Sequence, residues 1–384
     1  MRAVVLSDVQ SLRVEQVPIA ELHPHDVRLR VAAVGLCGTD FHIYEGHGNY
    51  NTDALGRRVP LDQEPQILGH EIVGFVEEVG SEVRGLGSGQ RVVVDQGRNC
   101  SSQRRVACEY CVSGYTHQCE YYAEHGITGL PGGLAETLTI PAVNVLKTGG
   151  ELSDAELALT EPLACVIHSM DVALRSRVRY GLGEGADLYA TTLLITGAGP
   201  AGLLFVQYLR NVIGYEGQLL VSEPNPNKRA LAEQFGATAF DPRAGGLVET
   251  VLDLTRGRRI ECLIEASGSA AVLADVPGVI RKLATLLVYG HGHSGVDVSV
   301  LSNIQFKEPA LLTPTGASGA LDDQGRPSVY RRSLELLQSG RIRVAPLITH
   351  RYGSLEAVPA AFLGVHRTAD YIKGVVELGG GRES

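Results

Sequence analysis

The cysteines are the residues of this sequence with the clearest capacity for chemistry. Cys37 lies in GLCGTDFH, and four others fall within twenty residues of one another: Cys100, Cys108, Cys111 and Cys119. The last three follow the spacing Cys-x2-Cys-x7-Cys, which is typical of a loop whose thiolates hold zinc. Four such residues predict a closed structural zinc site. The alternative is a set of unrelated surface thiols.

A second group of metal-binding residue types is spread along the chain. His70 and Glu71 lie in LGHEIVGF, and Glu161 lies in TEPLACVIH. Together with Cys37 they offer sulfur, nitrogen and oxygen ligands, a set that suits a zinc ion with one position left open for catalysis. Each residue alone has a structural explanation: a buried small hydrophobe, a core histidine, or a charge at a helix N-terminus. As a group, they predict a catalytic metal centre.

The stretch LLITGAGPAGLL predicts a dinucleotide site. An apolar strand runs directly into a glycine-rich turn, and a helix follows. Gly197 permits the tight turn, Gly199 allows close approach of a pyrophosphate, and Gly202 lets helix and strand pack closely. The helix N-terminus offers free N–H groups to the phosphates. The expected contacts in this turn are Gly197, Gly199, Pro200, Ala201 and Gly202. The alternative is a glycine-rich turn without a ligand.

The next strand carries the residue that would choose between NAD and NADP. Glu223 follows Gly202 by 21 residues and can accept hydrogen bonds from the adenosine ribose, while its charge would repel a 2′-phosphate. NAD is therefore favoured over NADP, although Lys228 and Arg229 follow closely. Ser267, just after the strand ECLIEA, is assigned to the same cofactor site.

These residues need two kinds of scaffold. Up to about residue 150, short valine-rich runs (AVVL, DVRLRVAAV, EIVGFVEEV, QRVVV) predict a compact β unit, interrupted by a long loop over residues 46–65. Ser153 is a plausible helix N-cap. From there, strands and helices alternate, which predicts a parallel sheet covered by helices on both faces. The sequence thus predicts an α/β protein of two domains.

Composition narrows the class of protein. The chain has a formal charge of −9, and we see no tract rich in lysine or arginine, which argues against a nucleic-acid binder. The N-terminus lacks the apolar segment of a signal peptide, and no run approaches the length of a membrane-spanning helix. We therefore expect a cytoplasmic protein without a membrane partner, in a reducing environment where clustered cysteines bind metal.

The motifs occur in a familiar order. GLCGTDFH, GHEIVGFVEEVG, GQRVVV, the four-cysteine loop, EPLACVIH and GAGPAG together resemble the medium-chain zinc-dependent alcohol dehydrogenases, and most of all their polyol and sugar (sorbitol dehydrogenase-like) branch. The resemblance covers essentially the whole chain. It implies a GroES-like catalytic domain over residues 1–163, a Rossmann domain over residues 164–319, and a return to the catalytic domain over residues 320–384.

The resemblance also implies roles for single residues. Cys37 and His70 would bind catalytic zinc, Glu161 would bind it directly or through water, and Glu71 would lie beside it or replace the water transiently. Thr39 and His42 match the family's proton-relay positions. One departure stands out: the family usually places two residues between its first two structural cysteines, and this chain has seven, SSQRRVA.

The expected activity is interconversion of a secondary alcohol and a ketone on a polyol, sugar or cyclitol, with zinc and NAD. A threonine-type dehydrogenase of the same family is an alternative, as is a zinc-free reductase of the superfamily. A non-catalytic sensor that binds NAD and zinc is a third. The resemblance further implies a homodimer or homotetramer.

Overall fold

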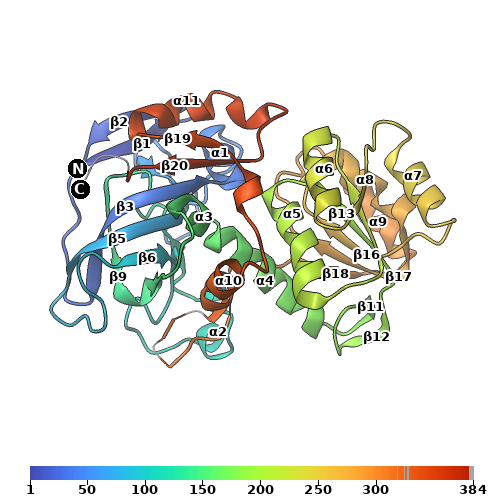
Figure 1. The fold of residues 1–384 in the computed structure, drawn as a ribbon, viewed down its shortest axis with the longest axis horizontal. Coiled ribbons are helices and arrows are strands. Elements are labelled where there is room, and N and C mark those ends of the chain that lie inside the picture. The colour runs from blue at the N-terminus through green and yellow to red at the C-terminus, as the bar shows by residue number, and fades with distance from the viewer. Residues whose placement is uncertain (318, 324, 327, 380–384) are drawn as a thin grey trace. The chain divides into compact units, whose positions relative to one another are not determined.

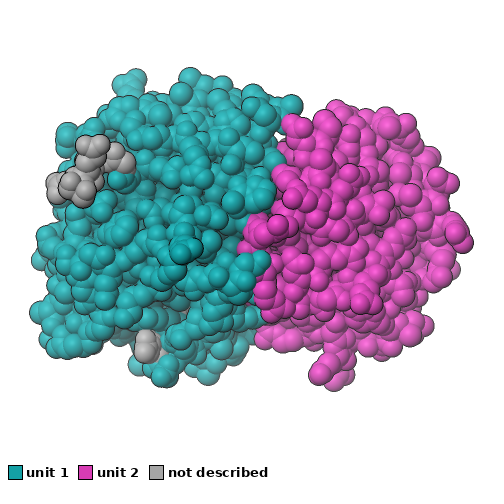
Figure 2. Space-filling model, in the orientation of Figure 1, with its two compact units in different colours: residues 1–164, 317–340, 344–384 teal, residues 165–316, 341–343 magenta. Residues whose placement is uncertain are grey.

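The computed structural model describes residues 1–384 except residues 318, 324, 327 and 380–384. The chain forms two compact units, which Figure 2 shows in different colours. Unit 1 comprises residues 1–164, 317–340 and 344–384, and unit 2 comprises residues 165–316 and 341–343. The segment 341–343 thus groups with unit 2, although the sequence analysis assigned all of 320–384 to the catalytic domain.

Unit 1 is built mainly from β-strands (Figure 1). Its largest sheet has the order β10-β6-β5-β3-β20-β19, with β9 also paired to β3. These strands are β3 (Asp26–Leu36), β5 (Glu71–Val79), β6 (Arg91–Val94), β9 (Thr137–Pro141), β10 (Val145–Lys147), β19 (Ile348–Tyr352) and β20 (Lys373–Glu377). The strands predicted from valine-rich runs are therefore present. The last two strands come from the C-terminal part of the chain, where β20 pairs with β3 and β19 pairs with β20.

Two small sheets and several short helices complete unit 1. One sheet has the order β2-β1-β4 and the other pairs β7 with β8. They consist of β1 (Arg2–Asp8), β2 (Ser11–Gln16), β4 (Gln66–Ile67), β7 (Gly97–Arg98) and β8 (Ala123–Glu124). The helices are α1 (Gly38–Tyr44), α2 (Glu109–Val112), α3 (Asp154–Ala158), α10 (Ser328–Gln338) and α11 (Val358–Phe362). The core is aliphatic, with fully buried side chains such as Leu29, Leu36 and Ile72.

The helical stretch after Ser153 divides into two helices. The Ser153 side chain accepts a hydrogen bond from the backbone N–H of Glu156, which makes it the N-cap of α3 as predicted. Helix α4 (Thr160–Arg175) follows at once. The stretch Asp154–Arg175 is long and apolar enough to cross a membrane, so the expectation that no run reaches that length is wrong. However, 78% of its apolar window is buried, as in the core helix of a globular protein.

Unit 2 contains a six-stranded parallel sheet with the order β15-β14-β13-β16-β17-β18. Its strands are β13 (Thr192–Thr196), β14 (Gln218–Ser222), β15 (Thr238–Phe240), β16 (Ile260–Glu265), β17 (Ile280–Val288) and β18 (Ala310–Leu312). This order places the third, second and first strands on one side and the fourth to sixth on the other, which is the doubly wound pattern of dinucleotide-binding domains. The Rossmann fold expected from the sequence is therefore confirmed.

Helices connect these parallel strands. They are α5 (Pro200–Gln207), α6 (Pro226–Gln234), α7 (Leu247–Leu254), α8 (Ala270–Val279) and α9 (Ser299–Gln305). A separate parallel pair, β11 (Val178–Gly181) and β12 (Ala186–Tyr189), precedes the sheet. Because β13 and β14 are parallel, their C-terminal ends lie at the same edge of the sheet. The glycine-rich turn after β13 and Glu223 after β14 therefore lie close together.

Candidate metal and dinucleotide sites

The first site forms where β3 ends and β5 begins. Cys37 follows β3 and precedes α1, in the extended backbone conformation of an N-cap. His70 and Glu71 open β5, and Gly35 of β3 pairs with Glu71 across the sheet. One ligand atom each of Cys37, His70 and Glu71 lies within 4.8 Å of the others. Two segments over thirty residues apart are thus joined by strand pairing.

Asp40 connects the two segments. Its buried carboxylate accepts hydrogen bonds from the backbone N–H of Cys37 at 2.8 Å and of Gly69 at 3.1 Å. It also lies 3.5 Å from Nδ1 of His70. Burial disfavours the imidazolium of His70, but the negative charges of Asp40 and Cys37 outweigh that effect and raise its pKa well above the usual value. The site therefore favours a positive charge next to Asp40 and Cys37, either a proton on His70 or a cation bound to its ring.

Glu71 is held from the opposite side by Lys373, the first residue of β20. The Lys373 ammonium donates to Oε1 of Glu71, and both side chains are buried. Among the described residues, the other oxygen of Glu71, Oε2, is buried without a hydrogen-bond partner, and so is Nδ1 of His70 apart from its 3.5 Å contact with Asp40. A buried acceptor left unpaired is costly unless something binds it. A cation between Oε2 of Glu71, the His70 ring and the Cys37 sulfur would satisfy the Glu71 oxygen, so the donor set fits a zinc ion.

Glu161 does not belong to this group of three. It lies in the first turn of α4, and its Oε1 accepts a hydrogen bond from Nε2 of Gln96 at 3.0 Å. Gln96 in turn accepts from the Tyr330 hydroxyl. Burial raises the pKa of the neighbouring Asp95 to about 8, and the charges of Glu161 and Glu124 contribute. Glu161 is thus one of several carboxyl groups buried in this part of unit 1.

The candidate proton-relay residues share the more open face of α1. Cys37, Thr39 and His42 are partly exposed, whereas Asp40, Phe41 and Ile43 are buried. Thr39 Oγ1 lies 3.8 Å from the Cys37 sulfur. His42 is one helical turn further and packs edge to face with His47, their ring centroids 6.2 Å apart. Thr39 and His42 therefore lead from Cys37 towards solvent.

Sequence reasoning missed four residues around this centre: Asp40, Gln96, Glu124 and Lys373. Asp40 has a signal, because its position three residues after Cys37 is that of a capping-box acid. Lys373 has one too, as a single charge in the apolar run YIKGVV. Glu124 is half-buried, and this partial burial raises its pKa. The sequence around Glu124 is rich in turn residues and contains no pattern that would have identified it.

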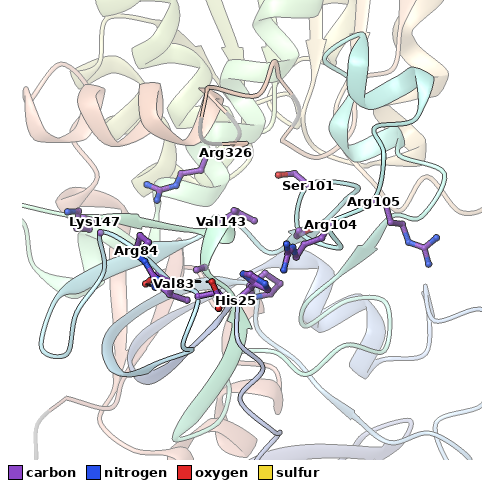
Figure 3. A pocket seen from close by; sticks show the side chains of 14 residues that line it. His25, Val83, Arg84, Ser101, Arg104, Arg105, Val143, Lys147 and Arg326 are labelled. Carbon is purple, nitrogen blue, oxygen red and sulfur yellow. Dashed lines mark hydrogen bonds and ion pairs between the residues drawn. The ribbon is translucent and has the colours of Figure 1, made fainter.

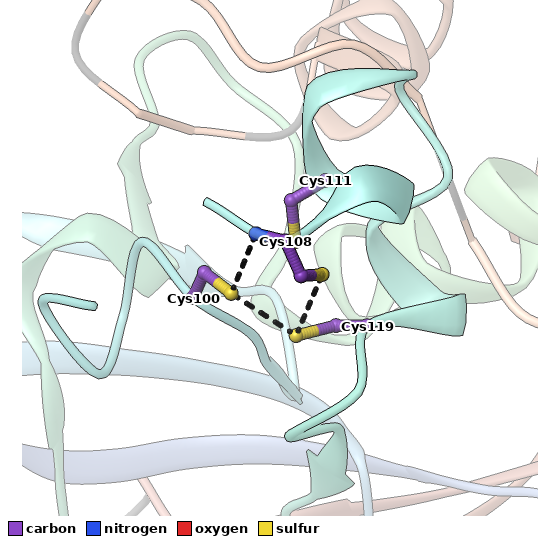
Figure 4. A group of neighbouring side chains, drawn as sticks. All are labelled: Cys100, Cys108, Cys111 and Cys119. Carbon is purple, nitrogen blue, oxygen red and sulfur yellow. Dashed lines mark hydrogen bonds between the residues drawn. The ribbon is translucent and has the colours of Figure 1, made fainter. Parts of the chain in front are cut away.

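The four loop cysteines form a second cluster. Cys100, Cys108, Cys111 and Cys119 each offer a sulfur within 4.8 Å of the others. In Figure 4 the four side chains converge from the loop and from α2. Sulfur atoms of Cys100 and Cys119 are 3.5 Å apart, and none of the four is in a disulfide. Seven intervening residues therefore still allow Cys100 to return to the cluster.

The protonation of these thiols differs along the loop. Hydrogen bonds from the backbone N–H groups of Cys111 and Glu120 lower the pKa of Cys108 to about 6. Burial raises the pKa of Cys111 and of Cys119. A metal binds thiolates, so it would have to displace protons from the two buried thiols while Cys108 is ready as an anion. Four convergent sulfurs fit a tetrahedral zinc ion.

The glycine-rich turn of unit 2 has the shape that a pyrophosphate requires. Gly197 has φ +90°, and a Cβ there would lie 3.0 Å from Cα of Ser267. A Cβ on Gly202 would lie 2.0 Å from the carbonyl oxygen of Gly197. A Cβ on Gly199 would meet nothing within 4 Å, so the space next to the start of α5 is open. Pro200 is the first helical residue, and its fixed φ suits that position.

Glu223 closes this turn from β14. Its Oε2 accepts from the backbone N–H of Ala198 at 2.7 Å and its Oε1 from that of Asn225 at 2.9 Å. Each oxygen keeps a second lone pair, so a ribose hydroxyl can still bind. Arg229 donates to the carbonyl oxygens of Glu223 and Pro224 and lies 3.3 Å from Asp241. The Lys228 backbone N–H donates to the Asn225 side chain.

Ser267 lies against Gly197, as a cofactor-binding position requires. Its hydroxyl and backbone N–H both donate to Oε1 of Glu265, a fully buried residue at the end of β16. His293 contacts Oε2 of Glu265 at 2.8 Å. Glu265 therefore fixes the turn beside the glycine-rich loop, a role that sequence reasoning did not assign.

Comparison with known proteins gives matches in both units. The family model described as "Alcohol dehydrogenase GroES-like domain" matches residues 23–150, and the one described as "Zinc-binding dehydrogenase" matches residues 200–339. An L-threonine 3-dehydrogenase of Pyrococcus abyssi is 31% identical over 348 residues, 90% of each chain. A sorbitol dehydrogenase of Arabidopsis thaliana is 28% identical, covering 97% of this chain and 94% of the relative.

A solved structure extends the likeness to three dimensions. It is a protein of Sinorhizobium meliloti 1021 described as a zinc-binding dehydrogenase, and its crystal structure contains NADP. Its TM-score against this chain is 0.76 at 28% identity, with 98% of each chain covered. Relatives described as acting on an amino acid and on a polyol thus resemble this chain almost equally.

Proposed function

Because this chain belongs to the medium-chain zinc-dependent alcohol dehydrogenase family, we propose that it oxidises a secondary alcohol of a polyol, sugar or cyclitol to a ketone with NAD, and catalyses the reverse reaction. The observation that carries the proposal is the group of Cys37, His70 and Glu71, in which Oε2 of Glu71 is buried without a hydrogen-bond partner among the described residues. A non-catalytic sensor would not need such a group.

Each residue of the centre has a separate task in this proposal. Cys37 and His70 would hold the zinc ion, Glu71 would lie beside it, and Glu161 would bind it directly or through water. Bound zinc supplies a Lewis acid that lowers the pKa of an alcohol, and the nicotinamide supplies the acceptor for hydride. Asp40 orients His70, and Lys373 restrains Glu71. These contacts fix the ligands before the substrate arrives.

The proton of the alcohol needs a path to water. Thr39 accepts it at its hydroxyl while passing its own proton to His42, which is partly exposed. Their positions one helical turn apart on the open face of α1 support this relay. A valine at position 39 preserves the shape without the hydroxyl, so we expect it to lower turnover and leave NAD affinity unchanged.

Cofactor choice rests on Glu223, Lys228 and Arg229. We propose NAD as the preferred cofactor, because a carboxylate at the end of β14 repels a 2′-phosphate. Glu223→Gln removes the charge and keeps one of the two hydrogen bonds to Ala198 and Asn225, because the amide oxygen accepts but the amide nitrogen does not. We expect NADP to gain affinity relative to NAD in this variant. Titrations with both cofactors test this, and an unchanged ratio contradicts the assignment.

The substrate class requires a direct screen. An NAD-coupled assay over polyols, aldoses, cyclitols and L-threonine, with and without a chelator, tests the proposal. Turnover of a polyol or cyclitol that the chelator abolishes supports it, and turnover confined to L-threonine favours the alternative suggested by the Pyrococcus relative. No turnover at all, with zinc and NAD both bound, would indicate the sensor.

We further propose a cytoplasmic homodimer or homotetramer that acts on small molecules. Exposed apolar side chains around α9 and β18 support the oligomer, namely Val298, Leu301, Phe306 and Leu311, with Phe306 87% exposed. Such a patch on unit 2 favours contact with a second copy. Light scattering of the purified protein measures the mass, and a strictly monomeric protein would contradict this part of the proposal.

A further inference from the structure

One hollow on unit 1 is rich in cations. It has a volume of about 890 Å³ and is open to solvent. Figure 3 shows Arg326 entering from one side, with Arg84, Arg104 and Lys147 around the opposite side. Glu82 is the one carboxylate among its lining residues. Since the whole chain carries a net charge of −9, this concentration of positive charge is a local feature.

One wall of the hollow comes from the unusual segment between the first two cysteines of the loop. Ser101, Ser102, Arg104 and Arg105 all line it, and all lie in SSQRRVA. This segment is an ordered turn. Asn99 accepts hydrogen bonds from the backbone of Ser101 and Ser102, and Arg105 N–H donates to the Cys100 carbonyl oxygen. The seven residues that replace the family's usual two thus build a defined surface.

The opposite wall carries a side chain without a partner. Nε of Arg326 is buried, and no described residue bonds to it. The adjacent backbone is fixed, because the Ser101 hydroxyl donates to the Gly325 carbonyl oxygen at 2.9 Å. The same bond joins the two walls. A buried guanidinium nitrogen that lacks an acceptor points to an anionic ligand.

The other cations of the hollow are also available. Within the described part of the chain, the side chains of Arg104 and Lys147 make no ion pair, and Arg84 lies 3.9 Å from the exposed Glu82. Arg105 differs, because its guanidinium stacks on Tyr121 at 4.2 Å and points away from the hollow in Figure 3. Arg84 also donates to the carbonyl oxygens of Ser81 and Val83. Arg104 and Lys147 are therefore the cations that offer unpaired charge to this space, beside Nε of Arg326.

A second basic hollow, on unit 2, provides a contrast. Its volume is about 500 Å³, and Arg258, Arg281 and Lys307 are among its lining residues. There the charges have partners: Arg258 and Arg281 contact Glu261, and the Lys307 ammonium donates to two backbone carbonyl oxygens. Charges already paired within the protein leave less attraction for a ligand. The unit 1 hollow is therefore the better anion site.

We propose that the unit 1 hollow binds a small organic molecule carrying two phosphate groups. Arg104 and Arg326 contact phosphate oxygens with their planar guanidinium groups, and Lys147 adds a third charge. Val83, Pro141 and Val143 line the same hollow and offer an apolar surface to the carbon skeleton. The volume is within the usual range for small-molecule sites, about 300–1,000 Å³. Binding ties the cysteine loop to the turn at Gly325.

Isothermal titration of the full-length, zinc-loaded protein with 2,3-bisphosphoglycerate at low salt tests this site. The probe has two phosphates and neither a free hydroxyl group nor a ketone, so it is not a substrate for the proposed reaction. We expect measurable binding that weakens with salt. The double variant Arg104→Ala/Arg326→Ala should weaken it by about tenfold or more, because each lost contact is charge-assisted. The probe 3-phosphoglycerate should bind more weakly than the bisphosphate.

Two matched variants decide whether the effect is specific. Arg105→Ala removes the same charge from the same segment, but its guanidinium points away, so we expect a change below about twofold. Arg258→Ala/Lys282→Ala in the unit 2 hollow should also leave the affinity unchanged. The variant Arg104→Lys/Arg326→Lys keeps the charge and should retain part of the affinity.

Several results would overturn the proposal. They are absence of binding at millimolar probe, an unchanged dissociation constant in the Arg104/Arg326 double variant, or an equal loss in either control. Zinc content and thermal unfolding, measured for every variant, identify a misfolded loop. If the Ala double variant misfolds, the Lys double variant supplies the comparison. The assignment is contradicted if the Lys double variant binds the probe as tightly as wild type while the unit 2 variant Arg258→Ala/Lys282→Ala binds it more weakly.

Discussion

The two metal-ligand clusters of unit 1 are brought together by different parts of the fold. The four thiols come from one twenty-residue loop and depend on local turns and the short helix α2. Cys37, His70 and Glu71 come from two paired strands of the large sheet, and Asp40 and Lys373 hold them from either side. The first cluster is closed by its own ligands, whereas in the second Oε2 of Glu71 has no hydrogen-bond partner within the described part of the chain.

This difference separates a metal that folds a loop from one that serves a reaction. All four ligands of the loop are cysteine sulfurs. Because the loop has little apolar core of its own, bound metal supplies its stability. In the sheet, strand pairing fixes the ligands before metal binds. We therefore expect loss of the first metal to lower stability and loss of the second to lower activity.

Replacing Cys37 by serine should have the largest effect. Loss of a thiolate ligand removes the catalytic zinc and with it the stabilisation of the developing charge, so we expect turnover to fall on the order of 1,000-fold or more. Zinc content should fall from two ions to one, with NAD binding nearly unchanged. Metal analysis and single-turnover assays measure this.

Cys262→Ser is the matched control, because that buried cysteine belongs to neither cluster. It should retain both zinc ions and its activity. Loss of NAD binding in Cys37→Ser, with zinc retained, would contradict the assignment of Cys37.

Replacing Cys111 by serine should mainly affect stability. The variant loses the loop zinc, and we expect the free energy of unfolding to fall by about 4 kcal/mol, since loss of a metal is among the few causes of changes that large. Denaturant unfolding and limited proteolysis within residues 100–119 check this. Activity measured well below the unfolding temperature should survive. A variant with unchanged stability and one zinc fewer would mean that the loop folds without metal.

The two clusters also differ in what sequence could predict. The loop cluster could be predicted from four thiols at suitable spacing, and the glycine-rich turn from its strand–helix context. The Cys37 centre required the resemblance, because no local pattern joins Cys37 to His70. Asp40 and Lys373 were missed because their importance arises from burial between distant segments. Glu161 was grouped with the ligands from the resemblance, and its role as a ligand stays a prediction, since the structure shows a hydrogen bond from Gln96 to one of its oxygens.

The buried pair of Lys373 and Glu71 tests how strongly the sheet fixes its centre. Lys373→Met leaves the Glu71 carboxylate buried without a counter-charge, so we expect a loss of about 3 kcal/mol in the free energy of unfolding. Arg351→Ala removes an exposed partner from the ion pair with Glu377 and should cost less than about 1 kcal/mol. Equal losses in urea unfolding would show that Glu71 is not held as a charged group.

Lowering the pH should affect stability through a second buried histidine, His125, whose pKa is shifted in the opposite direction to that of His70. Burial lowers the pKa of His125 to about 4, and its Nδ1 contacts the Pro131 carbonyl oxygen at 2.9 Å. At His70, by contrast, nearby negative charges raise the pKa. His125 therefore stays neutral in the folded protein while the unfolded chain takes up a proton near pH 6.5. Because the unfolded state binds more protons, stability falls as the pH drops from about 6.5 towards 4.

At pH 5 this effect should cost about 2 kcal/mol relative to pH 7.5. The variant His125→Asn removes the titrating group, so its stability should depend less on pH over that range, although it is less stable at neutral pH. Urea unfolding at both pH values provides the measurement, with the exposed His23→Asn as control. Identical pH dependence in wild type and His125→Asn would mean that His125 does not resist protonation, and the acid sensitivity of unit 1 would then lie with its metal ligands.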